Sequence, residues 1–78
     1  MFDFDACKGI AEKKAEEYNA SIDTAYKIGN DYAFDNTSEK WTGVFPFIVE
    51  TATGAICGLW EYLIRNDMTM DDLQEMTV

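Results

Sequence analysis

The chain contains no histidine, and this absence removes several classes of chemistry at once. Histidine is the side chain that ordinarily titrates near neutral pH, and it is the commonest protein ligand of transition metals. Catalytic groupings that pair serine or cysteine with histidine are therefore excluded. The only two cysteines, Cys7 and Cys57, are too few for a cysteine-only zinc site and do not form a C-x-x-C redox pair. We expect no metal and no cofactor, and we expect both cysteines to be small buried hydrophobic residues.

Basic residues are scarce as well. Six Lys and Arg stand against 15 Asp and Glu, which gives a formal net charge of -9. The one basic cluster, Lys13-Lys14, is flanked by Glu12, Glu16 and Glu17. Affinity for nucleic acid comes largely from Lys and Arg that displace counterions from the phosphate backbone, so we expect no direct binding to DNA or RNA. The charge instead favours a protein partner with a basic surface.

Long apolar runs are absent too. The longest, residues 44–49 and 55–60, are interrupted by Pro46 and Gly58 and are far shorter than the about 20 residues that cross a bilayer. The opening Met-Phe-Asp-Phe-Asp places acids where a secretory signal requires basic residues. We therefore expect a cytoplasmic protein that does not enter membranes.

What the chain does contain is enough apolar material for one small folded domain, residues 1–78, with 47% hydrophobic and 14% aromatic residues. A domain of this size rarely encloses a substrate cleft and keeps a core. Asp31, Asp35 and Glu50 could approach one another across strands and divide acid and base roles, but solvation at turns and strand ends is the favoured explanation. We expect no enzymatic activity.

In the first half, the apolar residues follow a helical spacing that predicts a helix over about residues 4–20, capped by Asp3 or Asp5. From Ile22 the period changes to two, which predicts a strand over 22–28. Residues 29–31, Gly-Asn-Asp, then favour either a tight hairpin into a second strand at 32–35 or a bulge within one long strand.

In the second half, residues 42–50 predict the strongest strand, with Pro46 at an unpaired edge or a bulge. A turn at 51–54, with Gly54 in the left-handed conformation, leads to a last strand at 55–57. Residues 59–66 fit two helical turns, with a continuing strand as the alternative. Thr69 is expected to cap a closing helix over about 70–76, stapled by Met68 and Leu73.

These elements predict an α+β fold in which the N-terminal helix packs on a three- to four-stranded antiparallel sheet, with one or two short C-terminal helices. The expected contacts join one face of the helix to one face of the sheet. On the helix the contacting residues are Ile10, Ala15 and Tyr18. On the sheet they are Tyr26, Phe34, Val44 or Phe45, and Ile56.

The order of a helix and a short meander, then Pro46-Phe47-Ile48-Val49 and Thr53-Gly54-Ala55-Ile56, resembles small bacterial domains in which a helix packs on an antiparallel sheet. Several polymorphic-toxin immunity proteins and PepSY-like modules are of this kind. The resemblance covers about residues 8–58 and implies a non-enzymatic inhibitor or regulator. Together with the charge, it leads us to expect a protein-binding module from a bacterium or a phage. It assigns no functional residue.

The candidate partner-binding residues are one aromatic and four acids: Trp41, Asp67, Asp71, Asp72 and Glu75. Trp41 stands at the mouth of a polar loop and is either an anchor for a partner or a lid on the core. The four acids do not have the spacing of a calcium-binding loop, and helix capping explains their positions. If they are exposed, their charges would also speed the association with a basic partner.

Two other functional classes stay open. A phage inhibitor that mimics nucleic acid, acting on a defence nuclease or a CRISPR complex, would need its acids along one elongated face, whereas an immunity-type role allows a mixed apolar and acidic patch. A structural or oligomeric module would use an unprotected strand near Pro46.

Overall fold

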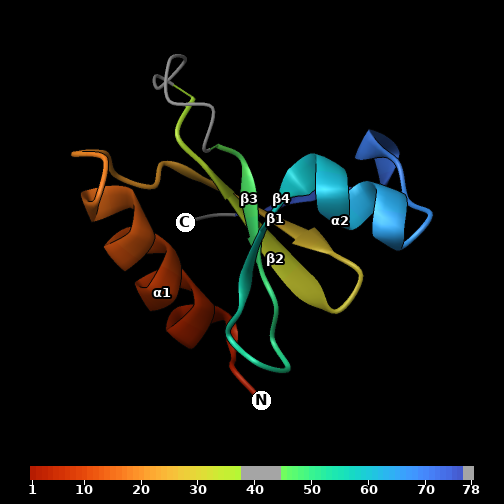
Figure 1. Cartoon of the computed structure of the whole chain (residues 1–78), viewed down its shortest axis with the longest axis horizontal. Coiled ribbons are helices and arrows are strands. Elements are labelled where there is room, and N and C mark those ends of the chain that lie inside the picture. The colour runs from red at the N-terminus through yellow and green to blue at the C-terminus, as the bar shows by residue number, and fades with distance from the viewer. Residues whose placement is uncertain (38–44, 77–78) are drawn as a thin grey trace.

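The computed structural model describes residues 1–37 and 45–76, and these form three layers, with a helix on each side of a five-stranded antiparallel sheet (Figure 1). This confirms the α+β fold with its N-terminal helix on the sheet. The strand order is β4-β3-β2-β1-β5. In chain order the elements are α1 (Phe4–Glu16), β1 (Thr24–Ile28), β2 (Asp31–Asp35), β3 (Phe47–Val49), β4 (Ile56–Gly58), α2 (Leu59–Arg65), the 3-10 turn η1 (Met70–Asp72) and β5 (Gln74–Met76).

Helix α1 begins where predicted, because the Asp3 side chain accepts a hydrogen bond from the Ala6 N–H at 2.9 Å. It ends at Glu16, earlier than the predicted residue 20. The reason is Asn19, which adopts a left-handed conformation with φ 55°, so that the Ala20 N–H closes the helix end on the Ala15 carbonyl at 3.0 Å.

Strands β1 and β2 form the tight hairpin rather than a bulged strand, with Ile28 opposite Asp31 and Gly29 at φ +56° in the turn. The first strand begins at Thr24 and not at Ile22. The turn between β3 and β4 also forms as predicted, with Gly54 at φ +76°.

Both faces of the sheet are covered, and each has its own core. Alternate residues of one strand enter opposite cores, as Ala33 and Phe34 do. The core beneath α1 contains Cys7, Ala11, Ala25, Phe34, Phe47 and Val49. The core beneath α2 contains Ile28, Ala33, Ile48, Leu59, Tyr62 and Leu63. The prediction of a single covered face therefore placed some residues wrongly.

One predicted contact of α1 is wrong for this reason, and two others fail because the residues are exposed: Tyr18 lies beyond the end of α1, and Ile56 lies on the α1 face of the edge strand β4. Tyr26 packs against the core beneath α2, and Tyr18 and Ile56 are 39% and 38% exposed. Cys57 is only half-buried and belongs to the α2 side of the sheet, whereas Cys7 is buried beneath α1. Val44 lies outside the described residues.

The predicted strand over 42–50 is described only from residue 45, and there the strand is Phe47–Val49, preceded by the cis Phe45–Pro46 peptide bond. Strand β3 pairs with β2 on one side and β4 on the other, so the expectation that the strand next to Pro46 in the sequence is itself an unprotected edge is wrong. The last predicted strand lies one residue later, at Ile56–Gly58. Residues 59–65 are helical, which decides against a continuing strand.

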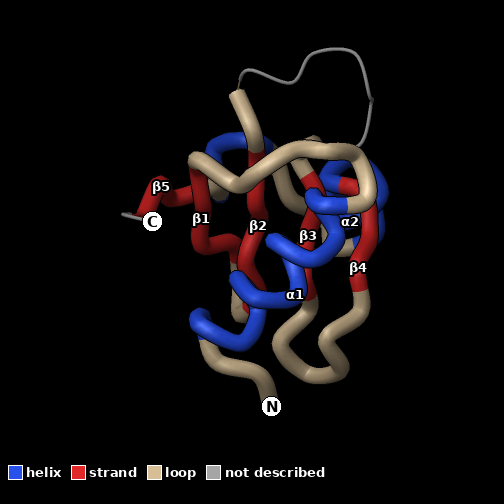
Figure 2. The backbone as a smooth tube through the Cα atoms, turned by 90° about the vertical axis from the view of Figure 1, so that its left-hand side faces the viewer, coloured by secondary structure: helices blue, strands red, loops and turns tan. Residues whose placement is uncertain are grey.

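The closing helix over 70–76 is wrong. Thr69 does form its cap, but only the single turn η1 follows, and Leu73 then adopts an extended conformation with ψ 129°. Residues Gln74–Met76 pair with the outer edge of β1 as β5 (Figure 2). An isolated helix of seven residues is marginal, whereas pairing with β1 provides backbone hydrogen bonds. Neither described α-helix reaches the length of a bilayer-spanning segment.

Candidate protein-binding surface

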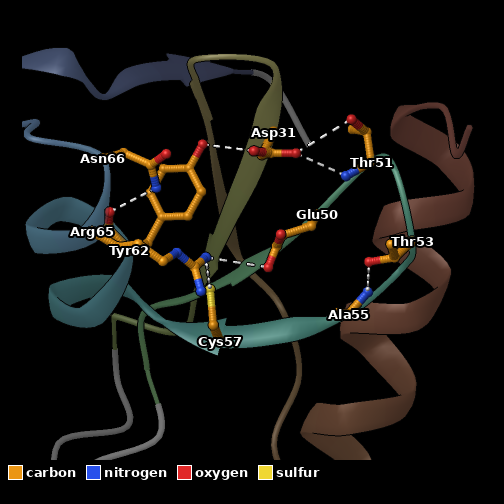
Figure 3. A network of polar contacts seen from close by, with 9 residues as sticks. All are labelled: Asp31, Glu50, Thr51, Thr53, Ala55, Cys57, Tyr62, Arg65 and Asn66. Atoms are coloured by element: carbon orange, nitrogen blue, oxygen red, sulfur yellow. Dashed lines mark hydrogen bonds and ion pairs between the residues drawn. The ribbon is translucent and has the colours of Figure 1, made fainter.

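Helix α2 is fixed to both hairpin turns by a polar network centred on Asp31. The Tyr62 hydroxyl donates to one carboxylate oxygen of Asp31 at 2.6 Å, and the Thr51 N–H donates to the other at 2.8 Å (Figure 3). The Thr51 hydroxyl donates to the Asn30 carbonyl at 3.0 Å. Burial and the Asp31 carboxylate together raise the pKa of the Tyr62 hydroxyl, which therefore stays a donor. The outer face of α2 is thus held in one orientation.

A second set of contacts fixes the end of α2. The Arg65 guanidinium lies 3.3 Å from the Glu50 carboxylate and 3.7 Å from the Cys57 sulfur (Figure 3). Burial and the charge of Glu50 raise the pKa of the Cys57 thiol, although Arg65 opposes this effect. Asp31 and Glu50, two of the three carboxylates considered for acid and base roles, are thus each engaged with a residue of α2.

The charges of the molecule are divided unevenly between its two sides. We define the α2 side as residues 59–72, which include α2 and η1, together with the side chains on the sheet face that α2 covers. The α1 side is residues 3–18, which include α1, together with the side chains on the opposite face. Among the described residues, the α2 side has eight carboxylates and one cation: Asp31, Asp35, Glu50, Glu61, Asp67, Asp71, Asp72 and Glu75, with Arg65. The α1 side has five carboxylates and four cations: Asp3, Asp5, Glu12, Glu16 and Glu17, with Lys8, Lys13, Lys14 and Lys27. The remaining described carboxylate, Asp23, precedes β1, accepts hydrogen bonds from the Thr24 and Thr37 hydroxyls, and is counted on neither side. The α2 side is strongly acidic and the α1 side is nearly neutral.

Two of these acids lie close enough to Tyr26 to affect its titration. Burial first, and then the charges of Asp35 and Glu75, raise the pKa of the Tyr26 hydroxyl. Burial also raises the pKa of Asp35, and the nearby charge of Asp23 adds to the effect. The acidic field therefore extends from α2 across to the β1–β5 end of the sheet.

Two large apolar side chains project from the outer face of α2. Trp60 is 65% exposed and Ile64 is 81% exposed, and they lie one helical turn apart. Sequence reasoning missed this pair. The available signal was that Leu59, Tyr62 and Leu63 already complete one buried face of the helix, which leaves Trp60 and Ile64 for the other.

The acids predicted to bind a partner all lie on the α2 side. Asp67 follows α2 in a left-handed conformation with φ 54°, and Asp72 accepts a hydrogen bond from the Thr69 N–H at 2.9 Å. Asp71 and Glu75 are exposed, in η1 and β5. Trp41, the predicted aromatic anchor, lies outside the described residues.

No family model, curated protein sequence or solved structure matches this chain. Within residues 1–37 and 45–76 no pocket is found, and no group of His, Cys, Asp and Glu side chains is arranged to hold a metal ion. The functional argument therefore depends on the exposed surfaces, of which the α2 side is the most distinctive.

Proposed function

We propose that this chain is a protein-binding module that inhibits or regulates a partner by occupying a basic surface on it. The observation that carries the proposal is the division of charge, with eight described carboxylates and one cation on the α2 side. Acids that served only solubility would have no reason to gather on one side. A gathered field raises the rate of encounter with a surface of opposite charge.

Two exposed hydrophobic residues supply the second part of the proposal. Trp60 and Ile64 stand within the acidic field, and a large aromatic side chain that loses its water on binding contributes contact energy. The polar network of Tyr62 and Asp31 holds the helix that presents them, so little conformational entropy is lost on binding. The acids would therefore set the association rate, and Trp60 and Ile64 the dissociation rate.

This mixture of apolar and acidic residues favours an immunity-type inhibitor, in keeping with the resemblance in sequence, over a mimic of nucleic acid. A mimic needs carboxylates at the positions of successive phosphates, and two large apolar side chains amid them would not serve that purpose. Addition of DNA provides the test. We expect a DNA duplex to leave the complex intact, and displacement by DNA at constant ionic strength would favour mimicry.

The steering role can be tested with two variants of equal net charge. Asp67→Asn with Asp71→Asn removes two charges from the α2 side, and Glu12→Gln with Glu16→Gln removes two from the α1 side. With a partner captured from cells that naturally express the chain, we expect the first variant to slow association about tenfold at low salt. The second should stay within about twofold of the parent. Equal slowing by both would mean that net charge alone acts, and that the α2 side is not the binding surface.

The anchoring role requires a different pair. Trp60→Ala with Ile64→Ala should raise the dissociation rate at every salt concentration, because the lost contacts are not electrostatic. Tyr18→Ala, which removes an exposed aromatic side chain from the α1 side, is the control and should leave the rate unchanged. An unchanged dissociation rate in the Trp60 and Ile64 variant, together with an increase in the Tyr18 variant, would place the interface on the α1 side.

A further inference from the structure

Within residues 1–37 and 45–76, strand β4 is an edge of the sheet, and no described strand pairs with the backbone groups on its outer side. Of the described strands it pairs with β3 alone, where the Glu50 N–H donates to the Ala55 carbonyl at 2.8 Å. In an antiparallel pair the direction of the backbone groups alternates along the strand. Cys57 therefore has the same orientation as Ala55, toward β3, and the N–H and C=O of Ile56 point away from the sheet.

This edge lacks the side chains that ordinarily prevent edge-to-edge pairing. Exposed edges are usually protected by lysine, proline or an inward-facing charge, whereas residues 55–58 are Ala-Ile-Cys-Gly. Ile56 is 38% exposed on the α1 face of the strand. The other edge, β5, carries Glu75. The two edges thus differ, and only β4 offers an uncharged strand.

The net charge of -9 does not prevent two copies from meeting at β4. Strand β5, with Glu75, is four strand spacings from β4, or about 19 Å, which is about twice the screening length at physiological salt. Glu50, which lies beside β4, is paired with Arg65 at 3.3 Å. The charge of Glu75 is therefore screened from this edge and Arg65 offsets that of Glu50, whereas the charge of Glu61 in α2 still acts on Cys57 of β4.

We propose that two copies of the chain associate through their β4 strands, antiparallel and about a twofold axis at Ile56. Each Ile56 N–H then donates to the Ile56 carbonyl of the other copy, and the two Ile56 side chains meet on the same face. The sheet becomes continuous, with both α1 helices on one face and both α2 helices on the other. The two acidic α2 sides then form one broad face, and a partner with two basic sites would be bound with added avidity.

Sedimentation equilibrium over about 5 to 500 micromolar tests the pairing with the chain alone. We expect a monomer–dimer equilibrium in the parent and an association constant at least about tenfold lower in Ile56→Lys, a standard protection of an edge. Glu12→Gln changes the net charge by the same amount, and it should dimerise as the parent does. A monomeric parent at every concentration, or equal weakening in both variants, would overturn the proposal.

Two further variants keep the test decisive. Should Ile56→Lys fail to fold, as judged by circular dichroism, a synthetic chain with an N-methyl group on the outward Ile56 amide blocks the pairing and keeps the side chain. That chain should be monomeric, and its dimerisation at the parent's strength would overturn the proposal.

Trp60→Ala with Ile64→Ala should dimerise as the parent does, because the β4 edge is distinct from the surface proposed to bind a partner. Loss of the dimer in that variant, and not in Ile56→Lys, would place the contact on α2 instead of β4.

Discussion

The hydrogen bond between Tyr62 and Asp31 allows a quantitative prediction, because Tyr62→Phe removes one hydroxyl and keeps the ring. Tyr62 is 4% exposed, and its hydroxyl donates to the Asp31 carboxylate at 2.6 Å. Hydrogen bonds to a charged group contribute about 1.5–3 kcal/mol, and Asp31 would keep its bond from the Thr51 N–H. The variant should therefore lose about 1.5–3 kcal/mol of its free energy of unfolding.

Urea unfolding followed by circular dichroism measures this loss. A small domain has a slope near 1 kcal/mol/M, so the midpoint should fall by about 1.5–3 M with the slope unchanged. Tyr18→Phe, at a 39% exposed side chain, is the matched control and should change stability by less than about 0.5 kcal/mol. A change in Tyr62→Phe as small as that of the control would refute the role of the network in holding α2.

The same hydrogen bond predicts a dependence on pH. Burial and Asp31 raise the pKa of Tyr62 above its ordinary value of about 10, so the folded state holds this proton more tightly than the unfolded state. Its contribution to stability is complete below about pH 10 and is lost as the pH rises further. The parent should lose more stability than Tyr62→Phe between about pH 10 and pH 12, and parallel losses would contradict the assignment.

Three further predictions concern the α2 side. Asp67→Gly should stabilise the chain by about 1 kcal/mol in thermal unfolding, because φ 54° costs an aspartate more than a glycine; destabilisation would refute this account of the helix end. Thr69→Ala should lower the free energy of unfolding by about 1 kcal/mol and increase amide hydrogen exchange at Gln74–Met76, because the cap begins the turn that leads into β5. Unchanged exchange at those residues would show that β5 forms independently of the cap. Burial is the main cause of the raised pKa of Asp35, so the charged carboxylate disfavours the folded state. Asp35→Asn should therefore increase the free energy of unfolding at pH 7 and leave it unchanged at pH 3. A decrease at pH 7 would show that the charge of Asp35 favours folding.

The sequence allows prediction of those features that depend on neighbouring residues. The Asp3 cap and the apolar spacing of α1, the turns at Gly29 and Gly54, and the two turns of α2 each follow from a few adjacent side chains. The second covered face could also have been predicted. The uninterrupted apolar run Phe47–Val49 is typical of a strand that is buried on both sides.

Features decided by distant contacts could not be predicted in this way. Residues 74–76 form a strand because the outer edge of β1 is available to them, and nothing in the three residues themselves requires it. The acids could be proposed as candidates because charge is visible in sequence. Trp60 and Ile64 were missed because the exposed side of an apolar helix depends on which side meets the sheet.

A crosslinking measurement in living cells tests the central claim most directly. A photoreactive phenylalanine derivative replaces Trp60 in one variant and Tyr18 in another, so that each side of the sheet is probed by one exposed aromatic position. The account predicts that position 60 crosslinks to a protein with a basic surface and that position 18 does not. Crosslinks to one protein from position 18, with none from position 60, would contradict it.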